Sequence, residues 1–143
     1  MNMLVAHRKQ LFDDAWQTRL NAPITDTGNA LSDDEIISLS RQLNIQELLA
    51  YRNAVGQRTH AIVTALSAND MKRKVSAQGL EAIKQAGGVT NQEDSLWILD
   101  FWGKKDVAGL LLMTSTRHVL LHLNDCCKWK RYIRQNKKCF RRP

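Results

Sequence analysis

The sequence contains no apolar run long enough to cross a membrane. Its longest uninterrupted run lies around residues 119–121 and falls far short of the roughly 20 residues that a spanning helix needs. A secretory leader is not expected either, because residues 1–6 are too few for an apolar targeting core and basic side chains follow them at once. We therefore expect a cytoplasmic protein that does not insert into membranes.

Cysteine is also scarce. The three cysteines are Cys126, Cys127 and Cys139, an odd number with two adjacent, which does not fit a disulfide framework. No two of them are spaced as C-x-x-C, so the pattern of a zinc ribbon is absent. Reduced thiols with no special role are the expectation.

Acidic residues are missing from the C-terminal end. Residues 128–143 hold eight of the 21 lysines and arginines and no Asp or Glu, whereas the rest of the chain has 13 basic and 14 acidic residues. The formal charge of +7 therefore belongs to this segment alone. We expect residues 128–143 to be a basic, poorly ordered tail behind a single domain at 1–127.

The fold class predicted for that domain is all-α. No stretch alternates convincingly for a strand, and no internal repeat is apparent. Ser32, followed by three acids, and Asn44, with Glu47 three residues on, are typical helix starts. The expected helices cover residues 1–20, a short segment from 33, then 45–67, 78–85, 91–102 and 106–130.

Two histidines four residues apart are the first candidate site. At helical spacing His118 and His122 project from one face about one turn apart, as two neighbouring ligands of a divalent metal do. Counting back from His118 in helical steps gives Leu111, Leu110 and Val107, so we expect the pair to face the core. Two histidines that simply pack in a helical bundle are the plainer alternative.

A third ligand is needed, since catalytic zinc usually takes three from the protein. His60, on the long expected helix, is the candidate, although it lies beside the main apolar stripe. His7 is a weaker candidate near basic residues. Asp125 is expected either to orient a ligand or to be a solvated acid near a helix end.

The basic segment supports another function. Residues 128–134 interleave lysine and arginine with Trp129 and Tyr132, a pattern that suits phosphate contacts and base stacking. A frayed extension is the alternative, and no helix-turn-helix or similar signature accompanies the pattern.

Between residues 11 and 125 the chain resembles the DinB-like superfamily, the damage-inducible, thiol-transferase-related four-helix bundles of bacteria. The most specific block is RHVLLHLN at 117–124, because family members carry two metal-binding histidines with this spacing on their last bundle helix. The looser blocks are QLFDDAW at 10–16, RL at 19–20, TG at 27–28, ELLAY at 47–51, LDFWG at 99–103 and VAG at 107–109.

The resemblance implies an up-down four-helix bundle, incomplete at the N-terminus, with zinc or nickel held by histidines that include His118 and His122. The family's first ligand precedes the matching segment, so neither His7 nor His60 corresponds to it. The implied activity is metal-dependent thiol transfer or hydrolysis, with a small-molecule thiol as substrate. The alternative is a non-catalytic helical module that binds nucleic acid or an acidic partner through its tail. An incomplete bundle also exposes an apolar face that a homodimer can cover.

Overall fold

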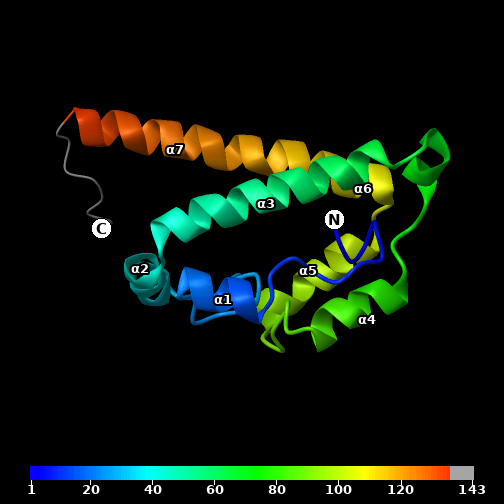
Figure 1. The fold of residues 1–143 in the computed structure, drawn as a ribbon, viewed down its shortest axis with the longest axis horizontal. Coiled ribbons are helices and arrows are strands. Elements are labelled where there is room, and N and C mark those ends of the chain that lie inside the picture. The colour runs from blue at the N-terminus through cyan, green and yellow to red at the C-terminus, as the bar shows by residue number, and fades with distance from the viewer. Residues whose placement is uncertain (136–143) are drawn as a thin grey trace. The chain divides into compact units, whose positions relative to one another are not determined.

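The structure, a computed structural model, describes residues 1–135 and shows helices joined by turns (Figure 1). Within these residues extended pairing is confined to one bridge, between Lys74 and Asp106, so the predicted all-α class is confirmed for them. No helix in this range combines the length and the apolar composition that crossing a bilayer requires. The chain divides into two compact units, Met1–Val107 and Ala108–Pro143.

The first unit contains most of the helices that the sequence predicted. α1 packs against α3, and α4 packs against α5. Its buried apolar side chains are Leu4, Val5, Leu20, Ile62, Val89 and Val107. The helices are α1 (Asp14–Leu20), α2 (Asp33–Gln42), α3 (Ile45–Thr64), the short 3-10 helix η1 (Ala68–Lys72), α4 (Ala77–Gln85) and α5 (Glu93–Gly103).

Side-chain caps fix where α2 and α3 begin. The Ser32 hydroxyl accepts a hydrogen bond from the Glu35 amide, while the Glu35 carboxylate accepts one from the Ser32 amide at 2.8 Å. Before α3, the Asn44 side-chain oxygen accepts from the amides of Gln46 and Glu47, at 3.1 and 3.3 Å. These caps satisfy amides that have no partner within the helix, and both predicted starts are confirmed.

The predicted helix over residues 1–20 is wrong for its first 13 residues. α1 starts only at Asp14, because the Asp13 carboxylate caps it by accepting from the Trp16 amide at 2.9 Å. Residues 1–8 form turns instead, and His7 has a positive φ of 52°, which no α-helix accommodates. Leu4 and Val5 are nevertheless buried, so the apolar residues of this segment belong to the core although they are not in a helix.

A cluster of aromatic rings joins α1 to α3. The Tyr51 ring meets the edges of Trp16 and Phe12, with ring centroids 5.1 and 5.7 Å apart. The Arg19 guanidinium lies over the Trp16 ring and donates from Nε to the Glu47 carboxylate at 2.7 Å. The two helices are therefore held by edge-to-face ring contacts together with an ion pair at their edge.

Arg73 connects segments that are distant in sequence. Its side chain donates to the Val5 carbonyl at 2.8 Å, and its carbonyl accepts from the Val107 amide at 3.0 Å. The Val75 amide donates to the Lys105 carbonyl at 3.2 Å beside the Lys74 bridge. This extended backbone begins only after η1 ends at Lys72.

The second unit is one helical run with an irregular turn. α6 (Val107–Leu112) leads into the π-helical turn η2 (Met113–Arg117), and α7 (His118–Arg134) follows directly. The observed boundary between units falls at Val107, whereas the sequence placed a division at residue 127. Residues 128–134 of the expected tail continue α7, and residues 136–143 lie outside the described part of the chain.

Replacing Asn44 with Ala tests the cap of α3. We expect the free energy of unfolding to fall by about 1 kcal/mol, because two amides lose their acceptor. Urea unfolding followed by circular dichroism measures the change. Gln46→Ala, at an exposed position in the same turn, serves as the control and should change stability by less than about 0.5 kcal/mol. Equal effects of the two substitutions would contradict this role of Asn44.

Tyr51 should make the fold sensitive to alkali. Burial, with a smaller contribution from the Asp13 charge, raises the pKa of Tyr51 above its ordinary value of 10.0. The folded state therefore holds this proton more tightly than the unfolded state, so its contribution to stability is present below pH 10 and is lost as pH rises through the raised pKa. Tyr51→Phe should lose less stability between pH 9.5 and 11.5 than the unchanged chain, whereas Tyr132→Phe, on exposed α7, should behave like the unchanged chain.

Candidate metal site

His118 and His122 lie side by side at the start of α7. Their Nε2 atoms are 2.6 Å apart, and their ring centroids are 4.5 Å apart with the planes tilted by 49°. This distance is that of a hydrogen bond between the two Nε2 atoms, in which the tautomers of the rings decide which nitrogen donates. The sequence prediction that the spacing brings the two imidazoles together is confirmed.

The pair does not face the core. Both side chains are exposed, although Val107 and Leu110 of the same predicted stripe are buried. The prediction of an inward-facing pair is wrong because α7 has no buried residue, so none of its faces lines a core. In η2 the His118 amide donates to the carbonyl of Met113, five residues earlier, so the turn holds an extra residue. Every side chain of α7 is rotated accordingly about the helix axis relative to α6.

Two threonine hydroxyls bond to backbone carbonyls at the irregular turn. The Thr114 hydroxyl donates to the Leu110 carbonyl at 2.8 Å, and the Thr116 hydroxyl donates to the Leu112 carbonyl at 2.6 Å. These side-chain donors compete with the backbone for carbonyls that an α-helix would pair with amides four residues on. Two threonines within three residues favour a local departure from the α-helical ladder.

The nitrogen pair is close to, but tighter than, a metal-binding arrangement. Zinc binds imidazole nitrogen at about 2.0–2.1 Å, and tetrahedral geometry then separates two nitrogens by about 3.3 Å. The observed 2.6 Å therefore has to widen by less than 1 Å, which small side-chain rotations accomplish on an exposed helix. The ion would replace the shared hydrogen, so the two residues fit a divalent metal as neighbouring ligands.

The remaining ligands are not supplied nearby by the described residues. No group of three or more His, Cys, Asp or Glu side chains suited to a metal ion occurs among residues 1–135. The Asp125 carboxylate pairs with the Lys128 ammonium at 3.1 Å. His60 lies exposed on α3 in the first unit, and its role as third ligand stays a prediction.

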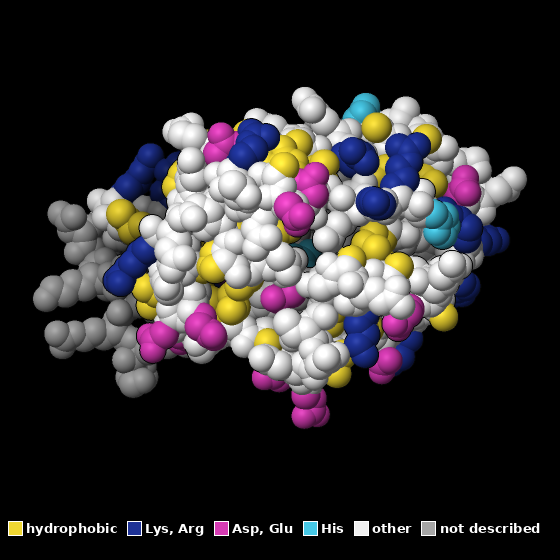
Figure 2. Space-filling model, turned by 60° about the horizontal axis from the view of Figure 1, so that its bottom comes forward, with side chains coloured by type: hydrophobic (Ala, Val, Ile, Leu, Met, Phe, Trp, Pro, Cys, Tyr) yellow, Lys and Arg dark blue, Asp and Glu magenta, His cyan; other side chains and the backbone are white. Residues whose placement is uncertain are grey.

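The other two histidines, His7 and His60, are also exposed to solvent. All four histidines are exposed, and histidine side chains reach the surface on the face drawn in Figure 2. The Nε2 atom of His7 already has a hydrogen-bond partner, because it lies 2.6 Å from an Nη1 atom of Arg73. His7 is exposed and has this arginine as its partner.

Sequence reasoning passed over the thiol of Cys126. It follows His122 by four residues, is exposed, and is not in a disulfide. The signal was available, since a Cys at this spacing projects from the same side of the helix as His122. His118 is eight residues away, about 12 Å along the axis, so one ion cannot use His118, His122 and Cys126 together.

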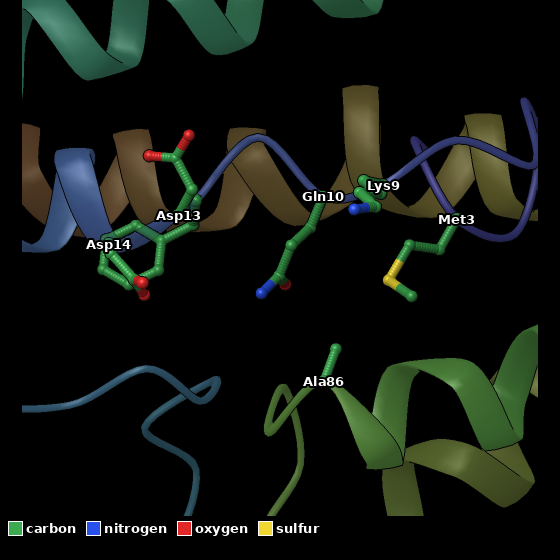
Figure 3. Close-up of a pocket in the computed structure, with 7 residues that line it drawn as sticks. Met3, Lys9, Gln10, Asp13, Asp14 and Ala86 are labelled. Atoms are coloured by element: carbon green, nitrogen blue, oxygen red, sulfur yellow. The ribbon is translucent and has the colours of Figure 1, made fainter.

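A small cleft lies in the first unit (Figure 3). It has a volume of about 310 Å³, near the lower limit for small-molecule sites. The side chains of Met3, Gln10 and Asp14 point toward Ala86 across the opening, whereas Asp13 points away and caps α1. The cleft is lined by Met3, Lys9, Gln10, Phe12, Asp13, Asp14 and Ala86, and this mixture of apolar, amide and charged side chains defines no particular reaction or ligand.

The basic residues of α7 are exposed as well. Lys128, Lys130, Arg131 and Arg134 are all at the surface, and Asp125 is the only acid in the helix. Comparisons of the chain with protein-family models, curated proteins and solved structures found no match. The side chains of α7 therefore carry the candidate functions of the chain.

Proposed function

We propose that this protein binds a divalent metal ion, zinc or nickel, through the Nε2 atoms of His118 and His122. The observation that carries the proposal is the 2.6 Å distance between these two nitrogens on an exposed helical turn. Both metals accept imidazole ligands, and a chelating pair spaced by four residues is pre-arranged by the helix itself. Little conformational entropy is lost when the ion binds, since the backbone is already ordered.

The resemblance to the DinB-like superfamily extends this proposal to a bacterial, cytoplasmic protein with an up-down four-helix bundle and a metal-dependent thiol transferase or hydrolase activity. The sequence block RHVLLHLN at 117–124 supports it most directly. A bound ion would polarise a substrate or lower the pKa of a thiol or water. The histidines of this chain would hold the ion, with the remaining coordination positions open to other donors.

Metal titration of the purified chain tests the proposal. Zinc added to the protein in a calorimeter should bind, and His118→Ala or His122→Ala should weaken binding by more than roughly 100-fold, beyond the effect of losing an outer-shell partner. Binding should also weaken in acid, because protons compete for the same nitrogens. Absence of zinc and nickel binding by the unchanged chain would refute metal binding.

Two further variants make the test specific to the site. Leu120→His combined with His122→Ala keeps four histidines in the chain but puts the pair on opposite faces of α7, so zinc binding should stay lost. His60→Ala tests the predicted third ligand. A fall in affinity would support His60 as a ligand, and an unchanged affinity would remove it.

A second candidate function is a non-catalytic helical module that binds nucleic acid or another acidic partner. The four exposed basic residues of α7, with one acid among its 17 residues, support this alternative. The aromatic residues Trp129 and Tyr132 lie on a different side of the helix from Lys130 and Arg134. Phosphate contacts are thus better supported than base stacking.

Salt dependence tests that alternative. If Lys130, Arg131 and Arg134 contact duplex phosphates, changing all three to Gln should reduce the slope of log affinity against log salt by about 2.7. Fluorescence anisotropy with a labelled duplex over a range of salt concentrations measures the slope. The control changes Lys72, Lys84 and Lys104 of the first unit to Gln, which removes the same charge and should leave the slope almost unchanged. Equal slopes in all three proteins would exclude this interface.

A further inference from the structure

We propose that two copies of this chain share one metal ion, with His118 and His122 of each copy forming a four-imidazole site between two α7 helices. The inference rests on the proposed metal binding and adds the source of the missing ligands. α7 offers two nitrogens where tetrahedral zinc takes four ligands. A second copy, related by two-fold symmetry, supplies the identical pair.

One chain supplies only two of the four ligands for a geometric reason. Asp125 is engaged by Lys128, and Cys126 is too far along the helix to join both histidines on one ion. No third donor completes a cluster with them among the described residues. Two exposed nitrogens on a convex helix surface can be approached by a second helix without backbone movement.

The side chains beyond the histidines suit such a partner. From His118 onward, spacings of four, three, four and three residues lead to His122, Asp125, Trp129 and Tyr132. This is the repeat of a helix-pairing seam, and we call these five residues the histidine–tryptophan face. Trp129 and Tyr132 are each 47% exposed, which is high for large rings.

The flanks of this face agree with a paired helix. Leu121 and Ile133, beside the seam, are 66% and 64% exposed. Lys130, Arg131 and Arg134 fall on the opposite side, where a paired helix meets water. Leu120 and Leu123 are exposed there too, so apolar character alone does not select a face. The histidine pair selects the face, because only the histidine–tryptophan face brings metal ligands to the partner.

Charge selects the direction of the partner helix. Four basic residues lie between positions 128 and 134 of α7, against one acid in the whole helix. A parallel pair would bring eight positive charges together at one end, whereas an antiparallel pair places them at opposite ends. We infer that the two helices run antiparallel, with the two-fold axis between His118 and His122, so that Trp129 and Tyr132 of each copy lie over η2 and α6 of the other copy.

Neighbouring leucines provide a matched test. Leu121→Lys puts a charge beside the ligands in both copies and should prevent pairing while both histidines remain. Leu120→Lys adds the same charge at a position 59% exposed on the opposite face and should be harmless. Neither side chain is buried, so both variants should fold as the unchanged chain does, which circular dichroism checks.

The experiment combines calorimetric zinc titration with analytical ultracentrifugation of the full chain in reducing buffer, with zinc or with chelator. We expect one zinc per two chains and a dimer that dissociates in chelator, for the unchanged chain and for Leu120→Lys. Leu121→Lys should be monomeric, with its apparent zinc affinity reduced at least about tenfold.

The outcomes separate this inference from metal binding itself. A monomer that binds one zinc per chain overturns the shared site and leaves metal binding in place. A dimer that persists unchanged in chelator overturns the bridging role of the ion. If no zinc binds at all, both proposals fall.

Discussion

The hydrogen bond from the His118 amide to the Met113 carbonyl determines the orientation of the whole of α7. It closes a turn that is one residue wider than an α-helical turn, so the side chains after it are rotated relative to Val107 and Leu110. The buried residues lie before this turn, and the two histidines after it are exposed. A buried metal would need ligands that face a core, whereas this pair is accessible to ions and to partners in solution.

That accessibility changes the chemistry of the pair. A buried site gains from low dielectric and from ligands on several helices, but an exposed pair on one helix has only its two nitrogens and water. The affinity of such a pair depends on what supplies the other coordination positions. This is why the flanking residues of α7, and not the histidines alone, bear on the function.

The first unit obtains its order from different interactions. Trp16, Tyr51 and the Arg19–Glu47 pair hold α1 on α3, and Arg73 ties the N-terminal turns to the start of α6. None of these residues is close in sequence to the histidine pair. The cleft near Asp14 lies in this unit, and among the described residues the histidine pair that carries the candidate chemistry belongs to α7.

The sequence by itself determined where most helices begin and that His118 and His122 meet. Caps such as Ser32 and Asn44, and a spacing of four residues, act over a single turn, so the local sequence is sufficient for them. Only the folded structure decided that residues 1–13 are not helical and that the histidines face outward. The first depends on contacts such as that of Arg73 with Val5, 68 residues apart. The second depends on what packs against α7: none of its residues is buried, and helical periodicity in the sequence does not show whether another surface covers an apolar face.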